Sequence, residues 1–327
     1  MSPGLDGARP PIDVDAPRSA GSLRPDLLLW LLFVAFAVAM TPPPPAAPWI
    51  TDDEAQVLQR QVDRAIDRER RWESKRGDRV IPWDEARGRV AIVIDDVGRE
   101  LHLFDQLLAL RYRLTFAVLP HGVYTPGVQL RLRADRRRPR DILLHLPMEP
   151  REHAAMEPEI AAGEVFLRTT DDDAAIAAKV RAALDRVPAA VGVSNHMGSA
   201  FTAEAHAMAA VMKALVGRDL FFLDSLTVTG SEAHAAAAHA GIPAIRRTLF
   251  LDHDPSPTAV RSQVRRAAEL SLDGAPVVVI GHPSPAVVEI LRQELPRLEA
   301  AGVGVYPLGE VVARSRAADP GGPPPGR

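Results

Sequence analysis

Between residues 88 and 315 the chain alternates short apolar runs with longer amphipathic segments. The runs VAIVI at 90–94 and VVVI at 277–280 have no polar face, which is typical of strands covered on both sides. The segment 169–187 places its apolar residues at helical spacing, and similar segments follow other runs. This alternation predicts a parallel α/β sheet with helices on both faces. Eight or so units favour a closed or nearly closed (β/α) barrel, and a doubly wound open sheet is the alternative.

Polar residues stand at the carboxyl ends of these apolar runs. Six runs are each followed, at once or one residue later, by a carboxylate or an imidazole. One such case carries little weight, because Asp and His are common in loops and helix caps, but six together are hard to attribute to chance. In a barrel or an open α/β sheet all these ends meet at one rim. The sequence therefore predicts a site at that rim, built from Asp95, Asp96, His145, Asn195, His196, Asp224, Asp252 and His282.

The adjacent acids Asp95 and Asp96 raise a specific question at the end of the first run. Side chains that are neighbours in a strand point to opposite faces, but a turn can aim both inward. Two bare carboxylates close together would repel each other and raise one pKa, and a bound cation removes that penalty. One aspartate can then bind the cation while the other accepts a proton from water. The alternative is that either acid caps the next helix or stabilises the turn at Gly98.

Composition narrows the chemistry that this rim can perform. The 327 residues include no cysteine, which excludes disulfides, thiolate nucleophiles and cysteine zinc sites. Net charge is −3, and the densest basic run, RRRPR at 136–140, is typical of a solvated loop, so no nucleic-acid partner is expected. The chain has neither a glycine-rich phosphate loop nor a G-x-S-x-G motif. Carboxylates and imidazoles without thiols favour a divalent metal, with zinc the preferred candidate.

An apolar run near the N-terminus predicts that the protein is exported. Residues 1–26 and 316–327 are predicted to be disordered from their composition. The apolar run at 27–40 has the length of a signal-peptide core; an uncleaved anchor in the inner membrane is the alternative, and a buried core helix is less favoured. Residues 41–87 predict a Pro-rich linker and a charged helix. Either of the first two interpretations makes the domain at 88–315 periplasmic or otherwise exported.

Five motifs follow one another along the chain: VAIVIDDVG, LLHLPMEP, GVSNHMGSAFT, FFLDS and VVIGHPSP. In this order they resemble the divergent polysaccharide deacetylase family, a branch of the NodB-type carbohydrate esterases, over roughly residues 88–312. The resemblance implies a distorted NodB-like (β/α) barrel of about seven parallel strands and metal-dependent removal of acetyl groups from sugars. By position it implies that Asp95 is the catalytic base, Asp96 and His145 are metal ligands, and His282 is the general acid.

The second motif departs from the pattern of that family. Typical NodB-type enzymes place two metal histidines a few residues apart, whereas His145 is followed by LPMEPRE and the next histidine is His153. His196 in SNHMGS is the better candidate for the second imidazole ligand, and a loop histidine bonded to backbone is the alternative. The remaining candidates, as substrate contacts or as groups that orient the ligands, are Glu149, Asn195, Asp224 and Asp252.

The leading hypothesis is a hydrolase that removes acetyl groups from an envelope or extracellular polysaccharide such as peptidoglycan. The altered histidine spacing and an aromatic content of 5% favour a second hypothesis, a non-hydrolytic envelope module that binds a glycan or a protein on the same fold. A third hypothesis is metal-dependent hydrolysis of a phosphoester or an amide at the same rim.

Overall fold

The computed structural model describes residue 60 and residues 80–135, 138–151 and 164–318. The predicted disordered N-terminus, the signal or anchor segment, most of the linker and the last residues of the tail lie outside this part of the chain. Within the described residues no helix is long and apolar enough to cross a membrane. From residue 80 onward the described residues form one α/β domain.

The domain is built on a single sheet in which every hydrogen-bonded strand pair runs parallel. The strands are β1 (Gly88–Val97), β2 (Thr115–Val118), β3 (Ile142–Met148), β4 (Gly192–Met197), β5 (Phe221–Asp224), β6 (Ala244–Arg246), β7 (Leu249–Phe250), β8 (Val277–Gly281) and β9 (Val303–Val305). Their order across the sheet is β6-β5-β4-β3-β2-β1-β8-β7, and β9 pairs with the start of β1. The predicted class, a distorted parallel (β/α) barrel, is confirmed. The sheet has nine strands rather than about seven, because it includes three strands of only two or three residues.

The chain itself joins the two ends of the curled sheet. Strands β6 and β7 stand at opposite ends of the strand order, yet only Arg247 and Thr248 separate them in sequence. The backbone N–H of Arg247 donates to the carbonyl of Asp224 on β5, and that of Thr248 donates to the carbonyl of Val278 on β8. The sheet therefore curls round until its edges are linked by backbone, although no strand pairing between β6 and β7 occurs in the described residues.

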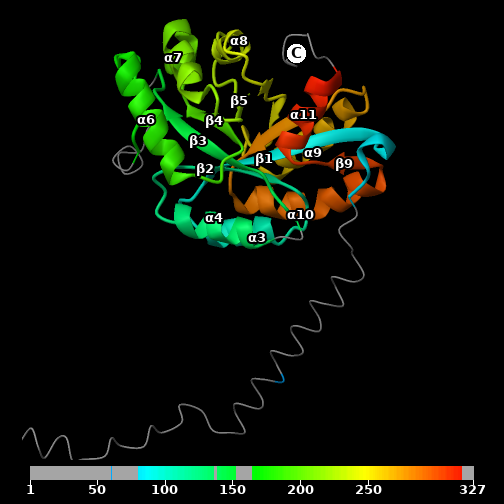
Figure 1. The fold of residues 1–327 in the computed structure, drawn as a ribbon. Helices are drawn as coiled ribbons and strands as arrows, with labels where there is room; N and C mark the ends of the chain where they lie inside the picture. The colour runs from blue at the N-terminus through cyan, green and yellow to red at the C-terminus, as the bar shows by residue number, and fades with distance from the viewer. Residues whose placement is uncertain (1–59, 61–79, 136–137, 152–163, 319–327) are drawn as a thin grey trace, which may run out of the picture. The chain divides into compact units, whose positions relative to one another are not determined.

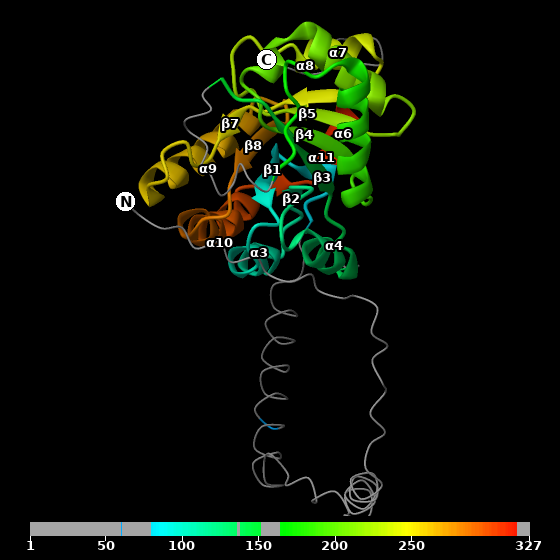
Figure 2. The same ribbon diagram turned by 90° about the vertical axis from the view of Figure 1, so that its left-hand side faces the viewer.

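Helices surround the outer face of the sheet (Figures 1 and 2). They are α3 (His102–Leu108), α4 (Thr125–Ala134), α6 (Asp173–Arg186), α7 (Ala205–Leu215), α8 (Ala233–His239), α9 (Pro257–Ser271) and α10 (Pro285–Ala300). Helix α11 (Leu308–Ala318) begins instead at the amino-terminal ends of the strands. There the N–H of Leu308 donates to Oγ1 of Thr115 on β2, and the N–H of Gly309 donates to Oδ2 of Asp141 just before β3.

The sheet separates two apolar clusters, as expected when alternate residues of a strand face opposite sides. On β1, Val90 and Ile92 pack in the outer cluster with the helices, whereas Ala91 and Val93 pack in the inner cluster. Residues of α11 and the buried Tyr306 complete the inner cluster at the amino-terminal end. The apolar filling of the barrel thus leaves its carboxyl-terminal end to polar side chains.

The domain extends beyond the boundaries that the sequence suggested. Ile81 and Trp83, which lie in the predicted linker, pack against the inner cluster. The hydroxyl of Tyr306 donates to the carbonyl of Ile81, and Trp83 meets the Tyr306 ring edge-on. At the other end α11 continues to Ala318, into the predicted tail. Aromatic packing at the base of the barrel accounts for the longer N-terminal boundary.

The end of β1 turns sharply enough to place two consecutive acids inside the barrel. The pairing register with β2 shifts between Ile94 and Val97, and Asp96 has a φ of 58°. Aspartate tolerates this left-handed conformation better than most residues do. Gly98 follows with a φ of 117°, and a Cβ there would lie 2.7 Å from Oγ1 of Thr125. Glycine is therefore required just after the acids.

We predict that Gly98→Ala lowers the free energy of unfolding by about 1–3 kcal/mol, because it adds both backbone strain and a steric clash. Chemical denaturation monitored by circular dichroism measures this change. Gly127→Ala is the matched control, since a Cβ at this position in α4 meets nothing within 4 Å and alanine favours a helix by up to about 1 kcal/mol. Equal stability of the Gly98→Ala variant and the wild-type protein would contradict this account of the turn.

Candidate metal centre

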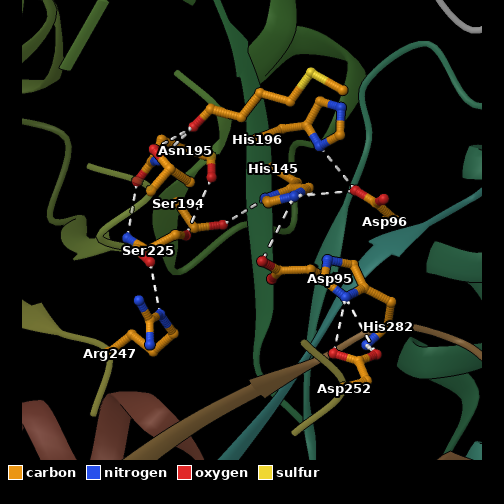
Figure 3. A network of polar contacts seen from close by, with 12 residues as sticks. Asp95, Asp96, His145, Ser194, Asn195, His196, Ser225, Arg247, Asp252 and His282 are labelled. Carbon is orange, nitrogen blue, oxygen red and sulfur yellow. Dashed lines mark hydrogen bonds and ion pairs between the residues drawn. The ribbon is translucent and has the colours of Figure 1, made fainter. Parts of the chain in front are cut away.

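Side-chain alternation brings predicted site residues to the carboxyl-terminal end of the barrel interior. On β1, on β3 and at the end of β8, an inner-cluster residue is followed two positions later by an acid or a histidine. Because alternate residues share a face of the strand, this polar residue points into the same interior. The pairs are Val93 and Asp95, Leu143 and His145, and Ile280 and His282. Figure 3 shows how these polar side chains lie beside Asp96 and His196.

Asp96, His145 and His196 form a compact cluster of potential ligand atoms. Oδ1 of Asp96 lies 2.8 Å from Nδ1 of His196 and 3.2 Å from Nε2 of His145. One ligand atom of each residue lies within 4.8 Å of the other two. Both histidines are buried, and the Asp96 side chain is 19% exposed. The structure thus brings together the three residues that the sequence analysis proposed as metal ligands.

The geometry of these atoms fits a bound cation. Oδ1 of Asp96 is buried and has no hydrogen-bond partner, although two imidazole nitrogens lie close to it. The three groups therefore face a common point rather than forming good hydrogen bonds with one another. Ligands of a tetrahedral zinc ion with bonds of 2.0–2.1 Å are about 3.3 Å apart, so the observed contacts need only small adjustments. One carboxylate and two imidazoles are a donor set suited to zinc, with room for further ligands.

Each imidazole is also held through its other ring nitrogen. Nδ1 of His145 lies 2.8 Å from the hydroxyl oxygen of Ser194, the residue opposite it on β4. Nε2 of His196 lies 3.3 Å from Oε2 of Glu164. A partner on the outer nitrogen fixes the orientation of a metal-binding imidazole, and such partners are usual around metal sites. Both rings therefore direct one nitrogen toward Asp96 and have a partner for the other.

The electrostatics of the cluster follow from burial and close contact. Burial alone would raise the pKa of Asp96, but His145 and His196 outweigh it and hold this pKa well below its usual range. Burial alone would lower the pKa of His196, but Asp96 and Glu164 outweigh it and raise this pKa to about 9. Without metal, His196 therefore carries a proton at neutral pH. A cation that binds there has to displace this proton.

Asp95 and His282 lie beside the ligand cluster as a second pair of titratable groups. Burial raises the pKa of Asp95, and the imidazoles of His145 and His282 offset this only in part. Oδ2 of Asp95 lies 3.6 Å from Nε2 of His145, and its buried Oδ1 has no hydrogen-bond partner. The side chain of His282 is 43% exposed, so a substrate can reach it.

Asp252 holds His282 in place from the adjacent strand end. Its carboxylate accepts the backbone N–H of His282 at 2.8 Å and lies 3.2 Å from Nδ1 of the ring. Burial alone would lower the pKa of His282, but Asp252, Asp96 and Asp95 outweigh it and raise this pKa to about 9. Phe250 stacks on the opposite side at a centroid distance of 6.2 Å. Among the predicted orienting residues, Asp252 is thus in contact with a proposed catalytic group.

Three other predicted residues lie outside this cluster. Strand alternation turns Asn195 away from the interior, where its side chain accepts the N–H of Ser225 and donates to the carbonyl of Met197. Asp224 is fully buried and accepts the N–H of Leu226. The carboxylate of Glu149 accepts from the N–H and hydroxyl of Thr169. Their polar contacts stabilise turns near the rim, so the structure gives them no contact with the ligands.

Arg99 and Glu164 contact the cluster although the sequence did not identify them as site residues. Arg99 binds the second oxygen of Asp96, with Nη1 3.1 Å from Oδ2, and Nη2 lies 2.6 Å from Oε1 of Glu164. Arg99 stands three residues after Asp96. A turn can bring residues at this spacing into contact, but the spacing alone is only a weak indication that they pair. Glu164 follows no apolar run in the sequence, and it lies between β3 and α6. No local pattern in the sequence distinguishes it from other acids.

The family model for divergent polysaccharide deacetylases matches residues 92–312. This match covers the whole sheet apart from the first residues of β1, and it includes every residue of the cluster. The chain belongs to this family. The resemblance predicted from the five motifs is therefore confirmed.

Two uncharacterized proteins and one solved structure are similar to this chain. The uncharacterized protein YibQ of Escherichia coli K12 is 36% identical over 211 residues, which are 63% of this chain and 62% of YibQ. An uncharacterized protein of Haemophilus influenzae Rd is 33% identical over 213 residues, covering 65% of this chain and 73% of its own length. A crystal structure of an uncharacterized protein from Agrobacterium tumefaciens C58 shares the fold, with a TM-score of 0.61 at 21% identity over 71% of this chain and 92% of that one.

The cluster predicts that the full chain binds one divalent cation. Alanine at Asp96, His145 or His196 is expected to abolish binding at stoichiometric metal, because each change removes one of three ligands. Elemental analysis of purified variants measures the metal content. Asp224→Asn is the matched control, since this acid is buried but lies outside the cluster. Undiminished metal content in all three alanine variants would exclude the site.

The raised pKa of His196 predicts a specific pH dependence of metal binding. Below about pH 9 the metal-free protein holds a proton on His196 that binding must release. Metal affinity is therefore expected to fall about tenfold for each pH unit lowered from neutral pH. Titration calorimetry in buffers with different ionisation enthalpies measures the released proton. A metal affinity that does not change with pH would contradict the proposed role of His196.

Proposed function

We propose that this protein is a metal-dependent hydrolase that removes acetyl groups from a polysaccharide of the cell envelope. The observation that carries the proposal is the pair Asp95 and His282 beside the ligand cluster. Burial raises the pKa of Asp95, which makes its carboxylate a stronger base. Asp252, Asp96 and Asp95 raise the pKa of His282 to about 9, so His282 holds a proton to donate at neutral pH. A carboxylate base beside a protonated acid is the arrangement that general acid–base catalysis uses.

The proposed reaction is hydrolysis of an acetamide or acetyl ester. The oxygen of a water molecule attacks the acetyl carbon while Asp95 accepts its proton. His282 donates a proton to the leaving nitrogen or oxygen as the bond to the acetyl carbon breaks, and the products are acetate and the free amine or hydroxyl. Burial of Asp95 favours its role, because a carboxylate with a raised pKa accepts protons more readily.

Asp96, His145 and His196 would hold the cation that this reaction uses. A divalent cation at this position supplies Lewis-acid polarisation of the acetyl carbonyl and lowers the pKa of the attacking water. Asp252 keeps His282 protonated and in a fixed orientation through its two contacts with that residue. Each polar side chain at the centre of the rim thereby has a distinct role.

Membership of the divergent polysaccharide deacetylase family supports a glycan substrate. The apolar run at 27–40 supports export, with the domain in the periplasm and the run serving as signal core or inner-membrane anchor. Peptidoglycan is the acetylated polymer that such a location offers. The proposal therefore names an acetylated envelope glycan, with zinc as the preferred cation.

A non-hydrolytic binding module on the same fold is the alternative function. It would need the shape of the rim but neither the base nor the acid. The presence of both groups beside the ligand cluster favours hydrolysis over this alternative.

Acetate release from peptidoglycan and chitooligosaccharides tests the proposed activity. The metal-loaded full chain is expected to release acetate, a chelator to stop release, and added zinc to restore it. Asp95→Asn should reduce the rate by about 10²–10⁴-fold while metal stays bound, because it removes only the base. Asp141→Asn, a half-buried acid at the other end of the barrel, is the control that should keep the activity. Glycan binding without acetate release from any substrate would favour the binding module instead.

The contact between Asp252 and His282 predicts the alkaline limb of the pH–rate profile. Activity requires protonated His282, so it should fall as pH rises through the raised pKa. Asp252→Asn removes the carboxylate that stabilises the imidazolium, and the limb is expected to move to lower pH. The control Asp254→Asn changes an exposed acid on the same loop and should leave the limb in place. An unmoved limb in Asp252→Asn would exclude this role of Asp252.

A further inference from the structure

Four charged side chains form a closed ring around one edge of the ligand cluster. Its members are Asp96, Arg99, Glu164 and His196, and we call it the polar ring. The contacts run from Asp96 Oδ2 to Arg99 Nη1 at 3.1 Å, from Arg99 Nη2 to Glu164 Oε1 at 2.6 Å, from Glu164 Oε2 to His196 Nε2 at 3.3 Å, and from His196 Nδ1 to Asp96 Oδ1 at 2.8 Å. Nη2 of Arg99 also lies 3.4 Å from Nε2 of His196, across the ring. Rotation of any member therefore breaks at least one contact.

The contacts of the polar ring determine which atoms of Asp96 and His196 face the ligand cluster. Arg99 occupies Oδ2 of Asp96, which leaves Oδ1 to face the two imidazoles. Glu164 and Arg99 both lie beside Nε2 of His196, which leaves Nδ1 to face Asp96. The atoms directed into the cluster are thus selected by contacts on their opposite sides. A guanidinium suits this task because its planar fork can bind two carboxylates at once.

Glu164 is fixed in place by the residues that follow it. Leu167 pairs with β3 through two backbone hydrogen bonds, to Pro147 and to Glu149, and is fully buried. The carbonyl of Phe166 accepts from Nζ of Lys179 on α6. With this backbone anchored, the Glu164 side chain is only 7% exposed. Among the described residues, the ion-pair contact of its Oε2 is with His196.

Burial makes the contacts of Glu164 costly to lose. A buried carboxylate is stable only when it is paired. Oε1 of Glu164 binds Arg99, whereas Oε2, which is buried without a hydrogen bond, lies 3.3 Å from Nε2 of His196 as an ion-pair contact. The ion pair with Arg99 alone would be enough to stabilise the buried carboxylate of Glu164. Glu164 contacts Nε2 of the proposed ligand His196, and it also contacts Arg99, whose guanidinium binds the proposed ligand Asp96. These two contacts indicate a role at the cluster.

We propose that Arg99 and Glu164 are positioning residues of the metal centre, which hold Asp96 and His196 in the orientation that binds the ion. This inference rests on the metal dependence in the proposed function. Glu164, which lies 19 positions after His145 and outside the five motifs, would therefore contribute to the metal affinity. Loss of an outer carboxylate or its equivalent typically costs about 10–100-fold in metal affinity.

Metal dissociation constants of the full chain, measured by competition with a chromophoric chelator, test the proposal. Glu164→Gln removes the charge, and Glu164→Asp keeps the charge but shortens the side chain. Both are expected to weaken zinc and cobalt binding by about 10–100-fold. Arg99→Lys keeps the charge but cannot bridge two carboxylates, and it should weaken binding by about tenfold. Because both residues act through one ring, the double variant should lose less than the product of the single losses.

Asp173→Asn is the matched control, since this acid also lies close to Glu164 in sequence but pairs with the exposed His206. It should bind metal like the wild-type chain. The absorption spectrum of the bound cobalt gives a second readout, which should change in the Glu164 variants because the ligand geometry changes. Far-ultraviolet circular dichroism spectra of the metal-free variants should match that of the metal-free wild type, which shows that the variants are folded.

The outcomes separate this inference from the proposed function. Wild-type metal binding with unaltered affinity and cobalt spectrum in both Glu164 variants would overturn the positioning role alone. Loss of affinity in Glu164→Gln but not in Glu164→Asp would also overturn it, because charge rather than geometry would then explain the effect. A wild-type chain that binds no metal would overturn the metal dependence of the proposed function, and the positioning role with it.

Discussion

Consecutive side chains of a β-strand face opposite sides of the sheet, so Asp95 and Asp96 could not both reach one site if β1 ended regularly. The left-handed backbone at Asp96 and the register shift before Val97 remove this constraint. Asp95 keeps the inward direction set by Val93, and Asp96 turns toward the imidazoles. The tight turn at Gly98 allows the chain to leave the rim beside α4. Every role proposed here depends on this separation of two adjacent acids.

Charge balance explains how the histidines of the rim and the proposed cation would act together. Asp95, Asp96, Glu164 and Asp252 bring four carboxylates into a small, mostly buried region. In the metal-free protein His196 and His282 hold protons that offset part of this charge. A divalent cation bound there would replace the proton on His196 and leave the one on His282 available for donation. The same electrostatics that would favour metal binding therefore also prepare the proposed acid.

Much of the fold and the core of the site could be predicted from the sequence, because both follow from local rules. Apolar runs alternating with helical segments determine a parallel sheet, and strand ends determine where Asp95, His145, His196 and His282 meet. Asn195 and Asp224 share that position in sequence but face the other side of their strands, which the run lengths alone did not resolve. The contact between Glu164 and Arg99 depends on the pairing of Leu167 with β3, and this tertiary contact leaves no periodic signal in the sequence.

Asp96, His145 and His196 are proposed to hold one metal ion at the carboxyl-terminal rim, and the proposed chemistry depends on this ion. Anomalous diffraction from crystals of the zinc-loaded full chain, collected on both sides of the zinc absorption edge, tests this metal site most directly. The account predicts one strong anomalous peak bounded by Oδ1 of Asp96, Nε2 of His145 and Nδ1 of His196, with Asp95 and His282 beside it. A peak bound by other residues, or no peak in fully loaded crystals, would contradict it.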